Sequence, residues 1–440
     1  MKLVAIAVTL ACCVLMFFLN REYKLALMFM ATLVLSPLVL PLKSITPLIL
    51  LTFLFIVTEV KNIWLHWGRI RKSIALPYTI LAVTAFLAAL LTSPHLHNVN
   101  SFTYFTVYEL FTKMLAFVYA FLALRNKNSL KPLLTVSFYA LIFMTIMGIA
   151  NYFLGYSPYI EALKDDALEF ANEIRFRVQA TFNNPFDYGY VCVLLAILHL
   201  YAYKQNMERQ SIFMISEVCC LFGVITCNCR TIAFCYIVCL VIFFVTLQKD
   251  SRKKIIYFSA IVIAILATLL LFPFTRDLLL NILSIFDADS TVSGSSLTMR
   301  FTQMATVIYY IRGHWVFGRG VNFFNEDLGW SQGAELAADS DLQGLEGIYM
   351  QLLLERGVFG FAMFLVMMAI ILYVIIKYRK LGSRLFSLGI SVFSLYILFS
   401  FMTGELLSAV PTYYILGYVV ANFTKRSQIV KLMSEAKCLG

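Results

Sequence analysis

Residues 347–375 read GIYMQLLLERGVFGFAMFLVMMAIILYVI, and after Arg356 this stretch carries no charged side chain. A helix of about 20 apolar residues spans the roughly 30 Å hydrocarbon core of a bilayer. In lipid, the backbone polar groups must find partners within the segment, so a run of this kind is helical. The stretch therefore predicts a transmembrane helix.

The rest of the chain repeats this pattern. Of its 440 residues, 61% are hydrophobic and 13% are charged, against about 45–50% and 25% in soluble domains. Lipid must therefore solvate much of the chain. We expect residues 1–440 to form one all-α polytopic membrane domain of 12 or 13 helices, because the charges near residue 20 leave the N-terminal topology open. The apolar spans lie near 3–19, 25–42, 45–59, 74–92, 104–124, 132–154, 185–203, 211–226, 232–247, 255–273, 347–375, 384–402 and 405–423.

The net charge of +11 follows membrane topology and does not indicate nucleic-acid binding. Basic residues gather in every second connection from residue 60 onward, as the positive-inside rule requires of cytoplasmic loops. These connections are 60–73, 125–131, 204–210, 248–254, 376–384 and the tail after Lys425. The pattern predicts a bacterial cytoplasmic-membrane protein with its two long connections, 155–184 and 274–346, on the outer side.

The outer connection 274–346 holds arginines but no lysine. A connection longer than about 15 residues is usually functional or disordered. Arginine binds phosphate oxygens through a planar fork of donors and stays charged at any working pH. Its alternative role here is to pair with acids of the same loop. The predicted outer arginines include Arg300 and Arg319 in this connection, Arg177 at the end of the shorter one and Arg230 in a tight hairpin.

Five short motifs resemble the O-antigen ligase and repeat-unit polymerase superfamily. They follow one another in the superfamily's order and all lie on the predicted outer face. The motifs are Ala180-Thr-Phe-Asn-Asn-Pro185, Cys229-Arg230, Thr298-Met-Arg300, His314-Trp-Val-Phe-Gly-Arg-Gly320 and Glu346-Gly-Ile-Tyr349 continuing to Glu355-Arg-Gly-Val-Phe-Gly360. The resemblance implies a GT-C-like, all-α membrane glycosyltransferase with a large extracytoplasmic helical loop. Its active site would lie on the extracytoplasmic face of the bacterial inner membrane.

The departures from the superfamily pattern favour one branch of it. Where the ligases carry a His-Asn pair, this chain has Glu346-Gly347, and Asp339 and Asp341 precede that position. This acidic run is closer to the polymerases that extend O-antigen, capsule or exopolysaccharide chains. An O-antigen ligase, which transfers glycan from undecaprenyl diphosphate to lipid A-core, is the alternative. A lipid-linked glycan flippase or transporter is the second alternative, suggested by a possible Glu109–Lys113 pair within an apolar span.

The chemistry implied by the resemblance assigns roles to these residues. The leaving diphosphate needs fixed positive charge, and the candidates are Arg177, Arg230, Arg300 and Arg319. The acceptor hydroxyl needs a base within hydrogen-bond reach, and the candidates are Glu346, then Asp341 and Asp339. We expect no metal and no cofactor, since arginine would replace a divalent cation. The implied partners are an undecaprenyl-diphosphate-linked glycan, an acceptor glycan or lipid-linked glycan, membrane lipids and a chain-length regulator.

Five further residues are given structural roles. Glu355 and Arg356 lie about two turns inside the helix that begins near residue 347, and we expect them to be a buried structural pair. Gly357 and Gly360 would allow a neighbouring helix to approach closely. His314 is expected to pack within its loop.

Overall fold

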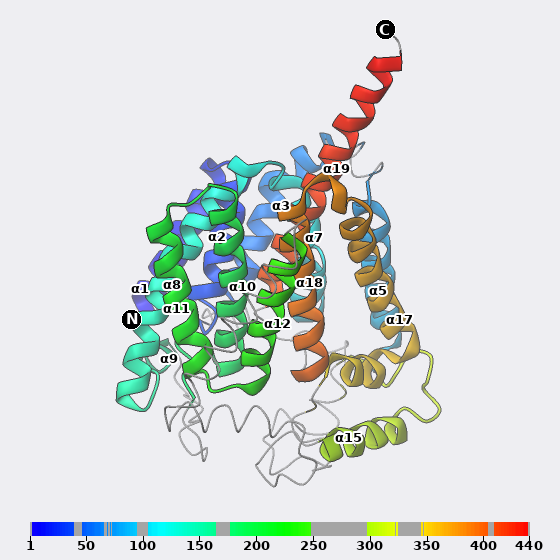
Figure 1. Cartoon of the computed structure of the whole chain (residues 1–440). Helices are drawn as coiled ribbons and strands as arrows, with labels where there is room; N and C mark the ends of the chain where they lie inside the picture. The colour runs from blue at the N-terminus through cyan, green and yellow to red at the C-terminus, as the bar shows by residue number, and fades with distance from the viewer. Residues whose placement is uncertain are drawn as a thin grey trace.

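The computed structural model describes residues 2–38, 46–65, 68, 71, 73–94, 104–163, 177–247, 297–321, 323, 345, 347–403 and 409–438. Within these ranges all regular secondary structure is helical, and they contain no strand. The long helices run side by side as a bundle, from one end of which the C-terminal helix projects, while α9 (Pro158–Leu163) and α15 (Leu297–Tyr310) lie at the other end (Figure 1).

The predicted spans coincide with helices wherever the structure describes them. Six helices in the described ranges are long and apolar enough to cross a membrane, and α1 and α11 are shorter apolar helices. The predicted span 255–273 lies outside the described residues. The helices of the bundle are α1 (Lys2–Phe18), α2 (Arg21–Val34), α3 (Pro47–Leu65), α5 (Ala75–Thr92), η2 (Tyr104–Met114), α7 (Ala116–Ala123), α8 (Lys127–Leu154), α10 (Pro185–Lys204), α11 (Gln210–Thr226), α12 (Arg230–Leu247), α17 (Ile348–Lys377), α18 (Ser383–Thr403) and α19 (Val410–Cys438).

The helix α10 forms the centre of the bundle. It begins at Pro185, and the Asn184 side chain caps it by accepting a hydrogen bond from the Phe186 amide at 2.8 Å. Nearly all of its side chains are buried. Its Tyr190 hydroxyl lies 2.6 Å from the Thr412 hydroxyl of α19, so polar side chains in the bundle interior find partners on neighbouring helices.

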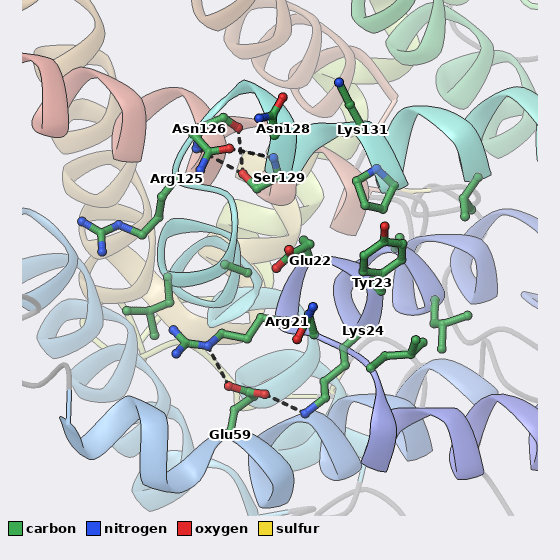
Figure 2. Close-up of a pocket in the computed structure, with 18 of the residues that line it drawn as sticks. Arg21, Glu22, Tyr23, Lys24, Glu59, Arg125, Asn126, Asn128, Ser129 and Lys131 are labelled. Atoms are coloured by element: carbon green, nitrogen blue, oxygen red, sulfur yellow. Dashed lines mark hydrogen bonds and ion pairs between the residues drawn. The ribbon is translucent and has the colours of Figure 1, made fainter.

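Two of the basic connections, 125–131 and 376–384, meet the C-terminal part of α19 at one end of the bundle, which we call the basic end. Here the Arg426 side chain donates to the Leu381 carbonyl at 2.9 Å, and the Asn422 amide donates to the Leu124 carbonyl at 3.2 Å. These contacts place the connections 125–131 and 376–384 beside the C-terminal part of α19. A large cavity lies at this end as well (Figure 2).

Candidate functional site

The packing of α12 on α18 places Arg230 at the end of the bundle opposite to the basic end. The Thr246 hydroxyl, near the C-terminal end of α12, donates to the Ser387 hydroxyl near the start of α18 at 2.9 Å. The two helices pack extensively and run in opposite directions. Arg230 lies 16 residues before Thr246, and Thr403 lies 16 residues after Ser387. At about 1.5 Å per residue, Arg230 therefore lies at the same end of the helix pair as Thr403, the last residue of α18.

Arg300 lies at this end too. Its Nη2 donates to the Met402 carbonyl of α18 at 2.8 Å. The last carbonyls of a helix have no partner within the helix and carry partial negative charge, so they bind a guanidinium well. Arg300 is thus held at the C-terminal end of α18, and Arg230, 70 residues earlier in the sequence, lies at the same end of the bundle.

Arg177 lies beside the hairpin that precedes α12. The amide of Val178 donates to the Thr226 carbonyl at 3.0 Å, which ties this segment to the C-terminal end of α11. The Arg177 guanidinium carbon lies 5.6 Å from the centroid of the Phe186 ring. Arg177, Arg230 and Arg300 therefore all lie at the end of the bundle opposite to the basic end.

The start of α17 packs against the same end of α18. The rings of Tyr349 and Phe401 stack with their centroids 5.6 Å apart. Gly347 has a φ of 115°, and a Cβ placed on it would lie 3.1 Å from the Phe401 carbonyl oxygen. The predicted bases Glu346, Asp341 and Asp339 lie outside the described residues, so their roles stay predictions.

The helix α17 is broken at Gly357, where φ is 63° and ψ is −168°. In a continuous helix the amides of Val358 and Phe359 would donate to the carbonyls four residues earlier. Here they donate to the carbonyls of Trp315 and Val316, at 2.8 and 3.0 Å. The loop 314–320 therefore supplies acceptors to the second half of the helix.

The same loop also satisfies the carbonyls on the other side of the break. The amides of Arg319 and Gly320 donate to the carbonyls of Leu354 and Glu355, at 2.8 and 2.9 Å. At the break, the helix lacks the two bonds from the amides of Val358 and Phe359 to the carbonyls four residues earlier. Four backbone hydrogen bonds between the helix and the loop take their place. We call this arrangement the loop clamp: residues 314–320 bonded to the break in α17.

Glycine is required on both sides of the loop clamp. Gly318 has a φ of 73°, and a Cβ there would lie 2.6 Å from the backbone nitrogen of Arg356. A Cβ on Gly357 would lie 2.4 Å from the Val316 carbonyl oxygen. The close approach that we predicted for Gly357 is therefore made to a loop backbone. A glycine inside an apolar helical run was the available sequence signal, but its partner was too distant in sequence to infer.

Arg319 and His314 both belong to this loop. Arg319 Nε donates to the Tyr310 carbonyl at 2.6 Å, and its guanidinium carbon lies 5.7 Å from the Phe323 ring centroid. These contacts stabilise the loop, and phosphate binding by Arg319 stays a prediction. His314 is exposed, and its carbonyl accepts a hydrogen bond from the Gly318 amide at 2.7 Å.

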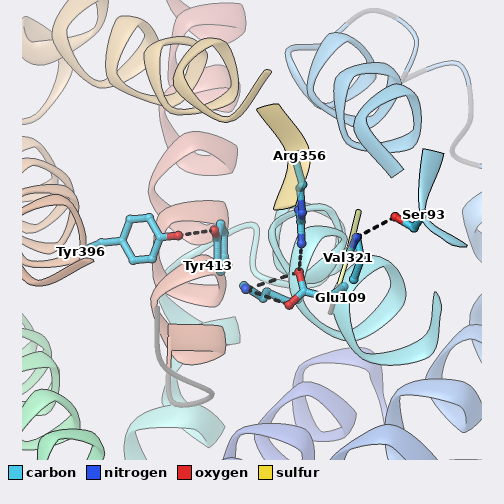
Figure 3. A network of polar contacts seen from close by, with 7 residues as sticks. Ser93, Glu109, Val321, Arg356, Tyr396 and Tyr413 are labelled. Atoms are coloured by element: carbon cyan, nitrogen blue, oxygen red, sulfur yellow. Dashed lines mark hydrogen bonds and ion pairs between the residues drawn. The ribbon is translucent and has the colours of Figure 1, made fainter. Parts of the chain in front are cut away.

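Arg356 also contacts a distant helix. Its Nη2 lies 3.3 Å from Glu109 Oε2 on η2 (Figure 3). Lys113 Nζ lies 3.2 Å from the other carboxylate oxygen, which confirms the Glu109–Lys113 pair. The Arg356 guanidinium carbon also lies 5.5 Å from the Phe105 ring centroid. Glu109 lies 247 residues before Arg356, so the local spacing of charges in the sequence could not predict this contact.

This cluster bears on the transporter alternative. The charges of η2 are held in an ion pair network with the broken helix α17, and the carboxylate of Glu109 contacts both cations. Such contacts fix the first half of α17 to its neighbour. Among the residues that the structure describes, no group of three or more His, Cys, Asp or Glu side chains is arranged to hold a metal ion.

The fold and the site together define a multi-pass helical membrane protein that gathers arginines from distant segments at one end of its bundle. Residues 215–365 match the protein family described as O-antigen ligase. The chain therefore carries an O-antigen ligase domain, and the family of this domain is associated with membrane glycan transfer in polysaccharide biosynthesis. The matched residues include Arg230, Arg300 and the loop clamp, which confirms the resemblance inferred from the motifs. No curated protein matches the chain.

Proposed function

We propose that this protein is a polymerase of polyprenyl-diphosphate-linked oligosaccharide repeat units. The observation that carries the proposal is the placement of Arg230 and Arg300, both within the O-antigen ligase domain, at one end of the bundle, where Arg300 contacts the C-terminal end of α18. Two guanidinium groups at the end of a helix bundle suit a lipid diphosphate, whose prenyl chain lies in the membrane while its charge stays at the interface.

The proposed transfer breaks the bond between the anomeric carbon of the donor glycan and an oxygen of the diphosphate. The leaving undecaprenyl diphosphate takes the electron pair, and the negative charge that develops on it is stabilised by the arginines. An acceptor sugar hydroxyl forms the new bond to the anomeric carbon, and its proton passes to Glu346. Because arginines supply the charge, we expect chelation of divalent cations to leave the transfer rate unchanged.

The choice of polymerase over ligase rests on the acids that precede α17. Glu346-Gly347 stands where the ligases carry His-Asn, and Asp339 and Asp341 add carboxylates that can hold sugar hydroxyls. The acceptor would then be a second lipid-linked glycan, on the extracytoplasmic face of the bacterial inner membrane. The second candidate, a ligase acting on lipid A-core, draws its support from the description of the matched family.

The test is glycan chain length in a deletion strain complemented with Arg230→Ala, Arg300→Ala or the control Arg312→Ala. Arg312 is exposed and packs its guanidinium 5.6 Å from the centroid of the Tyr309 ring. We expect the first two variants to leave single repeat units at normal membrane levels, since loss of one such donor typically costs about 10²–10³ in rate. Lysine at position 300 should rescue poorly because it lacks the planar fork.

The outcomes separate the candidate functions. Full ladders in both Arg230→Ala and Arg300→Ala would reject the proposed diphosphate site. Loss of polymer from lipid A-core, together with an accumulation of full-length polymer that is not attached to lipid A-core, would indicate a ligase. Loss of every repeat unit from the cell surface would indicate a flippase.

A further inference from the structure

The cavity at the basic end has a volume of about 1200 Å³, and Arg177, Arg230 and Arg300 lie at the opposite end of the bundle. It lies between the start of α2, the C-terminal end of α3 and the connection from α7 to α8 (Figure 2). None of its lining residues belongs to the O-antigen ligase domain at 215–365. The proposed transfer reaction makes no use of it.

Cations outnumber acids on the cavity wall. The cations are Arg21, Lys24, Arg125 and Lys131, and the acids are Glu22 and Glu59, which leaves a formal charge of +2. Glu59 is only 4% exposed and bonds two of the cations, with Arg21 Nε at 3.0 Å and Lys24 Nζ at 2.6 Å. One carboxylate balances one of these two charges, so the cluster keeps an excess positive charge.

The cluster is a built part of the fold. Lys24 is 4% exposed and also donates to the Thr58 hydroxyl at 3.0 Å. The Asn62 amide donates to the second oxygen of Glu59 at 2.9 Å. These bonds fix the Glu59 carboxylate and the Lys24 ammonium in place, so the cluster is preorganised beside the cavity.

The cavity wall is also apolar over part of its surface. Apolar side chains from α2 and the residues just before it, and from α7 and α8, lie next to the charged ones. These apolar side chains are Leu19, Ala26, Leu27, Leu122, Ala123, Pro132 and Val136. A small soluble anion would leave this apolar surface in contact with water. An amphiphile with an anionic head and a hydrocarbon chain would cover both parts of the wall.

We propose that this cavity binds the phosphate headgroup of an anionic membrane lipid. The phosphate lies between the Arg21–Glu59–Lys24 cluster and the cations Arg125 and Lys131, and the chain lies along the apolar part of the wall. Guanidinium and ammonium groups bind phosphate through charge-assisted hydrogen bonds, and basic pockets between membrane helices are suited to lipid headgroups. The inference does not depend on the polymerase proposal, since it uses other residues at the other end of the bundle.

The test measures thermal unfolding of the delipidated full-length protein in detergent. The additions are dioleoylphosphatidylglycerol, undecaprenyl phosphate, dioleoylphosphatidylcholine and inorganic phosphate, each tested separately. We expect at least one of the two anionic lipids to raise the Tm by several degrees, because a ligand that binds only the folded state stabilises it. The anionic lipid that acts at the lower concentration identifies the source of the headgroup. Equal stabilisation by phosphatidylcholine or by inorganic phosphate would overturn the proposal.

The variant Arg125→Gln/Lys131→Gln removes two cations from the cavity while it keeps the buried Lys24–Glu59 pair. The control Arg379→Gln/Lys380→Gln removes the same charge from exposed positions at the same end, outside the cavity. Native mass spectrometry should show at least fivefold less bound anionic lipid for the cavity variant and no change for the control. Equal lipid retention by the two variants would refute the proposed site, and the Tm without lipid reports whether each variant is folded.

Discussion

Substitution of Gly357 by alanine should disrupt the loop clamp and with it the proposed site. At its φ of 63° and ψ of −168° the backbone region is essentially restricted to glycine, and a non-glycine residue there costs about 1–3 kcal/mol. The added Cβ would also lie 2.4 Å from the Val316 carbonyl oxygen. The loop must therefore move away from the helix.

The movement breaks the hydrogen bonds from Val358 to Trp315 and from Phe359 to Val316. At about 1 kcal/mol net for each bond, the two losses and the backbone strain add up to roughly 3–5 kcal/mol. That is a large part of the 5–15 kcal/mol that stabilises a typical domain. If α17 becomes a continuous helix, it recovers part of this energy, but the first half of α17 then leaves its place beside Phe401.

The assay combines the glycan ladder with thermal unfolding of the purified protein. The matched control is Gly313→Ala in the same loop, because Gly313 has a φ of 81° and no atom within 4 Å of an added Cβ. That change should cost about 1–2 kcal/mol of backbone strain alone. We expect Gly357→Ala to lose polymer length and several degrees of Tm relative to Gly313→Ala. Equal ladders and equal Tm values in the two variants would show that the loop clamp has no role in the site.

Three further outcomes test other parts of the molecule. Glu346→Gln should leave single repeat units, since a general base typically contributes about 10²–10⁴-fold, and a normal ladder would remove Glu346 from the mechanism. A cysteine at Ser331 should react with an impermeant reagent in intact spheroplasts, whereas reaction only after lysis would place the loop 274–346 in the cytoplasm. Glu109→Gln should lower the Tm far more than Lys113→Met, because it removes the carboxylate that contacts both Lys113 and Arg356, and breaking a buried ion pair costs about 3–5 kcal/mol. In the lysine variant Glu109 keeps its contact with Arg356, so equal Tm values would argue against the buried cluster.

The helices could be predicted because lipid imposes a local rule on the sequence. Any segment that crosses the membrane must bond its own backbone and expose apolar side chains, so the spans are readable one at a time. The start of α10 is also local, because the Asn184 side chain caps the helix and Pro185 is its first residue. Glu109 and Lys113 were also predictable as a pair, since they lie four residues apart along the chain.

The candidate site depends on contacts that no local pattern encodes. The sequence indicated that Arg230 and Arg300 were unusual on the outer side, but their placement at the same end of the bundle depends on how α12 and α15 contact α18. The contact of Arg356 with Glu109 on η2 could not be predicted either, because the two residues lie 247 positions apart in the sequence.

The O-antigen ligase domain at 215–365 does not complete the site by itself. The carbonyl that accepts a hydrogen bond from Arg300 belongs to Met402, beyond the C-terminal boundary of the match. The carboxylate that contacts Arg356 belongs to Glu109, more than 100 residues before its start. Val321, at the end of the loop clamp, donates to the Ser93 hydroxyl of the segment after α5 at 2.7 Å (Figure 3). These three contacts favour the proposal that residues 1–440 act as a single membrane domain, in which the helices outside the match hold the arginines and the broken helix in place.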